Sequence, residues 1–418
     1  MEDITKKASY CLSCKSKNCM KGCPLSNDIT QAISYVKDCD YENAYKEFLN
    51  TTLLSSICGR ICPHSKQCQG SCIRGIKGES VSIGDIEAFV GDYGLEKDID
   101  INMLNNDKII DKKVAVIGSG PCGITCAATL KRLGVKNVTI FEKKDYLGGL
   151  LVHGIPDFRL SKDIVKKVYD KILSLGLDVK YNMELGRNIT LDELKNKYDA
   201  IFIAIGANIS SYMGIEGENL DGVYGGNELL EYKKYPDFKG KKVAVIGGGN
   251  VAMDVSRTLK RLGAKDVYVI YRRAKEQMPA ESKEIEEAIS EGINFLFLNN
   301  IVKVIGKEKV EKIECIKTKL IYEEGKRPYP QNIEGSNYII DMDYVIMAIG
   351  SCPEEKVLKN LGVNLNKWNK IEIDENYKTS MDKIYAAGDI AGVKSTVAYA
   401  SASGREAAKN IYYYLSNQ

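Results

Sequence analysis

Two short groups of cysteines near the start of the chain carry its most informative chemistry. The first group is Cys11, Cys14, Cys19 and Cys23, with Pro24 directly after the last cysteine. The second group is Cys58, Cys62, Cys68 and Cys72. Thiolates at such short spacings, with a proline after the last one of a run, are typical of iron–sulfur ligands. Two groups of four therefore predict two clusters.

Structural zinc and disulfides are the alternatives for these thiolates. Zinc sites favour Cys-x2-Cys pairs at both ends of the motif, and the second group has no such pair. Disulfide frameworks belong mainly to small secreted chains, whereas this chain has 418 residues and a polar start that lacks the apolar stretch of a signal peptide. We therefore expect a reducing, cytoplasmic location.

A glycine-rich turn, Gly118-Ser-Gly120-Pro121-Cys-Gly123, follows an expected strand at 114–117 and opens an expected helix. In a dinucleotide fold the first glycine makes the tight turn, the second admits the pyrophosphate and the third lets the helix pack on the strand. Glu142 ends the next expected strand, where a carboxylate binds ribose hydroxyls. Gly149, in a Gly-Gly pair, predicts a second close approach of backbone to the ligand. The alternative reading of both segments is a purely structural turn.

A second turn of the same kind follows an expected strand at 243–246, with alanine in the third glycine position. The next strand, at 267–271, runs into two arginines instead of an acid. An acid there binds a ribose 2′-hydroxyl, whereas an arginine accommodates a 2′-phosphate. This favours NADP(H) over NAD(H), unless the arginines are only a solvated surface pair. The residues of this candidate site are Gly247, Gly249, Asn250, Ala252, Arg272 and Arg273.

The composition limits the classes of protein to consider. Lys+Arg (59) and Asp+Glu (56) nearly balance, so we expect no nucleic acid partner. Apolar runs are too short for a membrane span. Residues 1–95 lack the alternation of strands, and 29–49 predicts a helix or a helix pair. After a polar linker at 96–113, strands and helices alternate, which predicts an α/β protein: a helical iron–sulfur domain followed by two Rossmann-like domains.

Three strings, together with the cysteines, resemble a known family. They are L-G-G-L-L-V-H-G-I-P-D-F-R-L at 147–160, the Y-R-R…M-P-A-E segment at 271–281 and A-A-G-D-I…G-R-E-A-A at 386–408. They are similar to the small (β) subunit of bacterial NADPH-dependent glutamate synthase. They equally resemble the N-terminal half of dihydropyrimidine dehydrogenase and the large subunit of NADH-dependent reduced ferredoxin:NADP oxidoreductase. The cysteine pattern is the most specific part of the resemblance, which covers nearly the whole chain.

The resemblance implies an NADPH-binding domain inserted in a discontinuous FAD-binding domain. The implied boundaries are 1–95 for the domain with two [4Fe–4S] clusters, 112–225 and 345–418 for the two parts of the FAD domain, and 226–344 for the NADPH domain. FAD contacts are implied at Gly118, Gly120, Pro121, Glu142, Gly149, Leu150, Arg159, Gly388 and Asp389, with Asp389 on the ribityl chain. NADPH contacts are implied at Gly249, Asn250, Ala252, Arg272 and Arg273, with Ala348 to Gly350 between the two cofactors.

The resemblance also implies how the ligands divide. In the relatives one cluster has four cysteines, and the other has three cysteines and a side-chain oxygen. The implied sets are Cys19, Cys23, Cys68 and Cys72 for the first, and Cys11, Cys14, Cys62 and Glu87 for the second. Cys58 then becomes a neighbour that is not a ligand. The residues alone leave open a four-plus-four arrangement in which Glu87 is an ordinary surface carboxylate.

The remaining cysteines, Cys122, Cys126, Cys315 and Cys352, form no Cys-x2-Cys pair, and we expect small buried hydrophobic residues there. Electrons should therefore pass between NADPH, FAD and the clusters, with no side chain acting as acid or base. We expect a hetero-oligomer with a larger catalytic subunit or a ferredoxin-type electron-transfer protein. The favoured function is that of a glutamate synthase β-like electron donor. The alternatives are a ferredoxin:NADP oxidoreductase subunit, bifurcating or not, and a non-catalytic assembly subunit.

Overall fold

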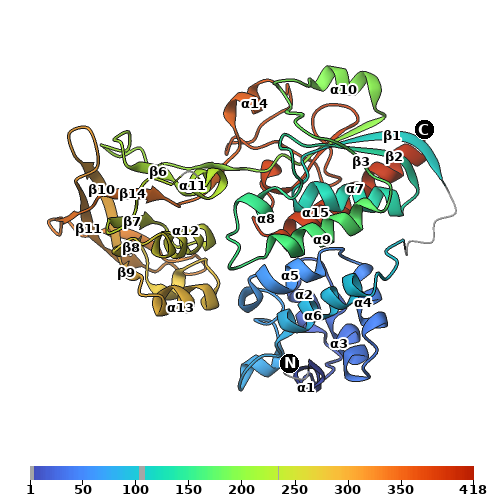
Figure 1. Cartoon of the computed structure of the whole chain (residues 1–418), viewed down its shortest axis with the longest axis horizontal. Helices are drawn as coiled ribbons and strands as arrows, with labels where there is room; N and C mark the ends of the chain where they lie inside the picture. Colours follow the sequence, from blue (N-terminus) through green and yellow to red (C-terminus); the bar gives the residue numbers. More distant parts are fainter. Residues whose placement is uncertain (1–3, 103–108, 234) are drawn as a thin grey trace. The chain divides into compact units, whose positions relative to one another are not determined.

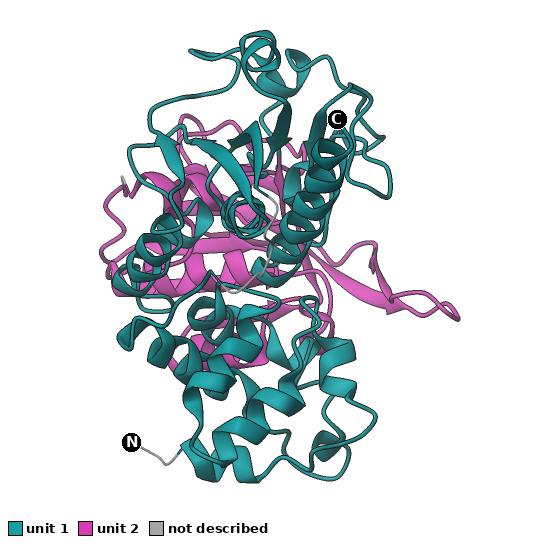
Figure 2. Cartoon of the chain, turned by 90° about the vertical axis from the view of Figure 1, so that its right-hand side faces the viewer, with its two compact units in different colours: residues 1–152, 157–207, 353–418 teal, residues 153–156, 208–352 magenta. Residues whose placement is uncertain are grey.

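The computed structural model describes residues 4–102, 109–233 and 235–418, which fold into two compact units (Figures 1 and 2). Unit 1 comprises residues 1–152, 157–207 and 353–418, and unit 2 comprises 153–156 and 208–352. The chain thus leaves unit 1 for unit 2 and later returns, which confirms the predicted insertion of one domain in a discontinuous other. Among the described residues, no helix combines the length and the apolar character needed to cross a membrane.

The N-terminal part of unit 1 is helical. The predicted helix pair is α3 (Ile29–Lys37) and α4 (Tyr41–Leu49), and each begins at an aspartate whose carboxylate accepts a backbone N–H of the first turn. Helices α5 (Ser55–Ile61) and α6 (Ile83–Glu96) pack closely, because a Cβ on Gly59 would lie 2.3 Å from the Ala88 nitrogen. The shorter elements are α1 (Ile4–Ser9), α2 (Asn18–Gly22), η1 (His64–Lys66) and η2 (Ile73–Ile76). Of the predicted linker, residues 103–108 lie outside the described residues.

The rest of unit 1 is a parallel sheet of five strands in the order β16-β4-β1-β2-β3. The strands are β1 (Ile110–Ile117), β2 (Val135–Phe141), β3 (Asp178–Lys180), β4 (Ala200–Ile203) and β16 (Ile384–Ala386). All four residues of β4 are buried, as expected for a sheet covered on both faces. The longer helices of this part are α7 (Pro121–Arg132), α9 (Lys162–Leu173), α10 (Leu191–Lys197) and α15 (Val397–Ser416), and the short ones include α8 (Leu150–His153) and α14 (Glu355–Lys359). Strand β16 shows that the C-terminal segment completes the sheet begun by β1.

Unit 2 contains a second parallel sheet of five strands, in the order β6-β14-β7-β8-β9. The strands are β6 (Val223–Gly225), β7 (Lys242–Ile246), β8 (Asp266–Tyr271), β9 (Asn294–Phe297) and β14 (Tyr344–Met347). Its helices are α11 (Gly226–Tyr232), α12 (Asn250–Arg261) and α13 (Ser282–Ser290). Strand β6 ends at the implied boundary after 225, and β14 crosses the implied boundary after 344. Both strands belong to unit 2, where they pair with each other beside β7.

An antiparallel sheet completes unit 2. It is formed by β10 (Asn299–Ile305), β11 (Lys312–Ile321), β12 (Tyr329–Asn332) and β13 (Tyr338–Asp341). Residues of β10, β11 and β14, among them Ile301, Ile313 and Val345, share one buried apolar cluster. A short pair, β5 (Ile209–Ser210) and β15 (Ser351–Cys352), joins the two ends of the inserted segment.

Candidate functional site

The first dinucleotide turn lies between β1 and α7, and its three glycines have different reasons to be glycine. Gly118 has φ +97°, and a Cβ there would lie 2.5 Å from the Ala204 carbonyl oxygen. A Cβ on Gly123 would lie 1.9 Å from the Gly118 oxygen. Gly120, in contrast, has φ −62°, which any residue adopts, and its Cβ would meet no protein atom within 4 Å. The protein itself requires the first and third glycines, whereas the second leaves room for a ligand.

Pro121 occupies the first turn of α7, where the backbone N–H that proline lacks would have no partner within the helix. The other N–H groups of this turn can bind an anion. Glu142 lies just after β2 and is buried. Its carboxylate accepts the Ser119 N–H (3.0 Å), the Ser119 hydroxyl (2.6 Å) and the Lys144 N–H (2.9 Å). A carboxylate has about four acceptor positions, so one remains for a ribose hydroxyl at the edge of the turn.

Ser119 is a site residue that we did not predict from the sequence. Its hydroxyl donates to Glu142 and accepts the Gly148 N–H (3.1 Å), and its carbonyl accepts the Tyr169 hydroxyl (3.0 Å). Ser119 therefore ties the turn, the carboxylate and the Gly-Gly pair together. The available signal was its place between two glycines of the turn, but the motif leaves the identity of that residue open.

The structure places two more predicted glycines of unit 1 at this turn and at the helix that follows it. Gly149 has φ +51°, and its Cβ would lie 3.1 Å from the Gly120 Cα, so the two glycine segments face each other. Gly388 has φ +75°, and its Cβ would lie 3.1 Å from the Cys122 Cβ on α7. Burial raises the pKa of the neighbouring Asp389. Leu150, which follows Gly149, and Arg159 are both partly buried.

The second dinucleotide turn, in unit 2, repeats this geometry. Gly247 has φ +137°, and a Cβ there would lie 2.2 Å from the Ala348 carbonyl oxygen. Ala252, in the third position, is fully buried. Gly249 has φ −91°, and its Cβ would meet only the Pro279 Cγ, at 3.9 Å. The middle glycine again faces open space, which fits a second pyrophosphate at the start of α12.

The polar side chains around this second turn differ in their exposure and in their hydrogen bonds to the rest of the protein. The Asn250 side-chain oxygen accepts the Glu281 N–H (3.0 Å), which holds the start of α13 against α12. Arg272 is exposed, whereas Arg273 is half-buried and donates its Nε–H to the Pro328 carbonyl (3.0 Å). Arg272 is therefore the freer of the two predicted phosphate ligands. Gly350 has φ +146° and lies in the exposed segment after Ala348.

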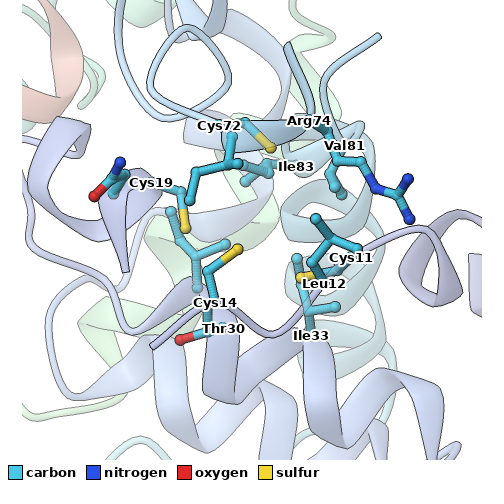
Figure 3. Close-up of a pocket in the computed structure, with 13 residues that line it drawn as sticks. Cys11, Leu12, Cys14, Cys19, Thr30, Ile33, Cys72, Arg74, Val81 and Ile83 are labelled. Carbon is cyan, nitrogen blue, oxygen red and sulfur yellow. The ribbon is translucent and has the colours of Figure 1, made fainter. Parts of the chain in front are cut away.

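Four cysteines, which we call the outer set, line one pocket in the helical part of unit 1. Figure 3 shows the side chains of Cys11, Cys14, Cys19 and Cys72 around it, with Leu12, Ile33 and Ile83 among the other lining residues. Each of these cysteines is partly exposed. The pKa of Cys19 is raised to about 11 by burial, with smaller contributions from Cys11 and Cys72.

The inner set comprises Cys23, Cys62, Cys68 and Glu87. Glu87 is 4% exposed, and burial raises its pKa to about 8 against a hydrogen bond from the Asn27 amide (3.3 Å). Burial and the Glu87 charge both raise the pKa values of Cys23 and Cys68. Cysteine thiols and carboxyl groups lose their protons when they bind a metal. A cationic cluster would therefore stabilise the thiolate and carboxylate charges that burial disfavours at this site.

Cys58 is buried beside the inner set, four residues before Cys62 on α5. The hydrogen bond between these two side chains is the main influence on both: it raises the pKa of Cys62, and it counters the rise that burial causes in the pKa of Cys58. A hydrogen bond from the backbone N–H of Ala398, at the start of α15, lowers the pKa of Cys62. Cys62 therefore lies against both Cys58 and the first turn of α15.

The structure divides the cysteines differently from the expectation. Cys11 and Cys14 lie with Cys19 and Cys72, and Cys23 and Cys68 lie with Cys62 and Glu87. Cys19 lies within α2, whereas Cys23 follows its end in an extended conformation (φ −89°, ψ 121°), so the two side chains do not share one helix face. The signal was present in the sequence, because in two-cluster ferredoxins the cysteine before proline binds the other cluster.

A single zinc ion and an iron–sulfur cluster require different distances between the ligand side chains. In the described part of the chain, no three His, Cys, Asp or Glu side chains are close enough to hold a single metal ion. A [4Fe–4S] cluster requires a wider arrangement, because each protein ligand binds a different iron. Sets of three or four thiols around a common space fit such a cluster.

We expect Gly120→Ala to abolish dinucleotide binding at the first turn while the protein remains folded. The added methyl group fills the space of the pyrophosphate but contacts no protein atom. Alanine is a poorer helix N-cap than glycine, which costs about 1 kcal/mol or less. Bound dinucleotide and thermal unfolding of the dinucleotide-free protein measure the two effects. Gly123→Ala is the contrasting variant and should lower the unfolding temperature itself; equal loss of stability in both variants would contradict the assignment.

Comparison with known proteins agrees with this geometry. The family described as pyridine nucleotide-disulphide oxidoreductase matches residues 112–407, and dihydropyrimidine dehydrogenase domain II, 4Fe-4S cluster, matches residues 1–99. Among solved structures, FprA from Mycobacterium tuberculosis in complex with NADPH has a TM-score of 0.66 at 19% identity, over 73% of this chain and 85% of FprA. Thioredoxin reductase from T. acidophilum has a TM-score of 0.56 at 22% identity, over 73% of this chain and 98% of that one. These likenesses confirm the fold.

Sequence relatives extend over almost the whole chain. The small chain of glutamate synthase [NADPH] from Escherichia coli is 35% identical, over 98% of this chain and 91% of that protein. Subunit beta of an NADP(+)-dependent formate dehydrogenase from Moorella thermoacetica is 34% identical, over 95% of this chain and 60% of its own length. The chain is thus an NAD(P)H-dependent oxidoreductase with FAD, NADPH and [4Fe–4S] sites, and it belongs to the family of the glutamate synthase [NADPH] small chain, within the pyridine nucleotide-disulphide oxidoreductases.

Proposed function

We propose that the chain accepts a hydride from NADPH at FAD and delivers the electrons singly, through two [4Fe–4S] clusters, to a partner subunit. The observation that carries this proposal is that the first dinucleotide turn and both cysteine sets belong to the same compact unit. We assign one cluster to the outer set, Cys11, Cys14, Cys19 and Cys72, and the other to the inner set, Cys23, Cys62, Cys68 and Glu87.

Direct bonds join the helical part of unit 1 to its nucleotide-binding helices. The Arg405 guanidinium, on α15, donates to the carbonyl oxygens of Leu25 (3.0 Å) and Thr51 (2.7 Å). Arg132, at the end of α7, donates to the Leu49 carbonyl (2.8 Å). Thr51 in turn donates to Asn27, which holds Glu87. These bonds fix the inner set relative to the helices that carry the dinucleotide site, as electron transfer requires.

The cofactors supply the chemistry when bound: FAD exchanges a two-electron hydride with NADPH and single electrons with iron–sulfur clusters. The protein binds and orients them. The open space at Gly120 and the helix start at Pro121 accept the pyrophosphate of FAD, and Glu142 accepts a ribose hydroxyl. In unit 2, Gly249 and Arg272 do the same for the pyrophosphate and the 2′-phosphate of NADPH.

Disulfide chemistry is not expected, although thioredoxin reductases share the fold. Cys122 and Cys126 are buried on α7, and burial raises the pKa of Cys122 to about 12. A thiol that stays protonated is a poor nucleophile. Cys315 is also buried, and Cys352 is partly exposed in unit 2 with its thiol near the Ile209 carbonyl (3.6 Å). The iron–sulfur route is therefore the exit that we propose.

The proposed partner is a larger catalytic subunit, in line with the names of the relatives. Those relatives are called a small chain or a subunit beta. The catalytic reaction of such a complex, glutamate synthesis being the favoured one, would then take place on the partner. An alternative use of the same electrons is exchange with a ferredoxin-type protein.

The test of this function is cofactor content combined with electron transfer. Anaerobically purified protein should contain about one FAD and about eight irons per chain. With NADPH it should reduce ferricyanide or viologen dyes, but it should neither form glutamate from glutamine and 2-oxoglutarate nor reduce thioredoxin-type disulfides. Stoichiometric zinc in place of iron, or glutamate formation by the isolated chain, would overturn the proposal.

Replacement of Arg272 and Arg273 should change the nicotinamide preference. The double Ala variant loses the charge-assisted hydrogen bonds to the 2′-phosphate, each worth about 1.5–3 kcal/mol. We expect KM for NADPH to rise at least about tenfold, with little change in KM for NADH. Arg272→Ala alone should have most of the effect, because Arg273 is already bonded to Pro328. Faster flavin reduction by NADH than by NADPH in the unmodified protein would refute this assignment.

Glu87 and Cys58 should respond differently to substitution, because we assign only Glu87 as a ligand. Glu87→Ala should remove or alter one cluster and leave the other, seen as a loss of about half the iron or a changed electron paramagnetic resonance spectrum. Cys58→Ala should keep both clusters. If Cys58→Ala loses about half the iron while Glu87→Ala loses none, the four-plus-four arrangement is correct.

A further inference from the structure

An exposed apolar surface covers the outer cysteine set. Leu12, between Cys11 and Cys14, is 52% exposed, and Ile76, on η2 just after Cys72, is 76% exposed. Tyr10 is 40% exposed and links the two segments: its hydroxyl lies near Gly78, and the Arg74 guanidinium stacks 4.2 Å from its ring centre. Exposed apolar side chains that gather in this way mark interaction sites. We call residues 10–22 and 72–78 the outer surface.

The charge of the outer surface has a single sign. Its charged residues are Lys15, Lys17, Lys21, Arg74 and Lys77, all basic, and the acidic residues that border it are the exposed Glu79 and the half-buried Asp28. Lys15, Lys21 and Lys77 are exposed, whereas Lys17 is paired with Asp28. The whole chain is nearly neutral, at +3, so this concentration of positive charge is local. An arrangement of cations around an apolar centre attracts and orients an acidic partner.

The outer surface contains the four cysteines that we assign to one [4Fe–4S] cluster. All four cysteines of the outer set are partly exposed, whereas Cys62 and Cys68 of the inner set, and Cys58 beside them, are buried. Leu12 and Arg74 line the same pocket as the outer cysteines (Figure 3). A protein seated on the outer surface would therefore come within short range of that pocket. Of the three cysteines of the inner set, Cys23 alone is partly exposed, so the outer set offers more accessible thiols than the inner set.

We propose that the outer surface is the docking site for an acidic electron-transfer protein, which binds with negative side chains around an apolar centre. This inference rests on the proposed function, because it names the partner surface for the same electrons. Weak electron-transfer complexes bury little area and depend on steering by charge. The lysines of the outer surface supply the steering, and Leu12, Tyr10 and Ile76 supply the apolar centre.

The test uses an acidic two-[4Fe–4S] ferredoxin as the probe and the full-length holoprotein. Lys15→Glu combined with Lys77→Glu should weaken ferredoxin binding at least about tenfold at low salt, measured by isothermal titration calorimetry, and should flatten its salt dependence. The matched control is Lys283→Glu combined with Lys307→Glu, two exposed lysines of unit 2 with the same change in net charge. The control should change the affinity less than about twofold.

A second pair of variants tests the apolar centre. Ile76→Ala should weaken binding mainly through faster dissociation, whereas Ile339→Ala, also exposed (59%) but in unit 2, should not. Iron content and NADPH-dependent ferricyanide reduction should be unchanged in every variant, since none of these side chains is a proposed ligand.

The outcomes separate this inference from the proposed function. If ferricyanide reduction succeeds but the Lys15/Lys77 variant binds ferredoxin as tightly as its control, the docking site is wrong and the function stands. If the unmodified protein binds ferredoxin but fails to pass electrons to any acceptor, the proposed function is wrong. If the surface variants instead convert a dimer of this chain into a monomer, the face binds a second copy and the proposal is overturned.

Discussion

The contact between α7 and α15 is the interaction on which unit 1 depends. A Cβ on Gly404 would lie 2.2 Å from the Cys122 carbonyl oxygen, so the two helix backbones touch. The Thr125 and Ser401 hydroxyls lie 2.9 Å apart in the same contact, although 276 residues separate them in the chain. Helix α7 carries the dinucleotide turn at its start, and α15 follows the Gly388–Ala391 segment. Their close packing therefore completes the FAD site from the two ends of the chain.

The same two helices also connect the dinucleotide site to the cysteine sets. Arg132 at the end of α7 and Arg405 on α15 each donate to carbonyl oxygens of the helical part. The first turn of α15 also lies against Cys62 through the Ala398 N–H. A redox unit needs such fixed geometry, because small changes in the environment of a cluster change its potential. The chain leaves unit 1 after β4 and returns to it before β16, so the insertion of unit 2 interrupts neither strand.

The two dinucleotide turns share one backbone conformation but are assigned to two different ligands. In both, the first glycine is fixed by a positive φ and by a neighbouring carbonyl, and the middle glycine faces open space. The turns differ where the adenosine ribose would lie. Glu142 is buried and already holds three hydrogen bonds from the protein, whereas Arg272 is exposed. A rigid acceptor suits an unphosphorylated ribose, and an exposed cation suits a phosphate.

The sequence by itself determined the element types and the identities of most site residues. Glycines with unusual φ, apolar strand runs and cysteine spacing are local properties, so the Rossmann units, the α3–α4 pair and the cysteines could be read directly. The division of the cysteines could be read only in part: the proline after Cys23 marks that cysteine as a ligand of the other cluster, but Cys72 and Glu87 reach their sets only through the packing of η2 and α6. The boundaries of unit 2 and the role of Ser119 likewise depended on tertiary contacts: β6 with β14, and Ser119 with Glu142 and Gly148. Local spacing fixes which groups can bind a cofactor, whereas long-range packing decides which of them share one.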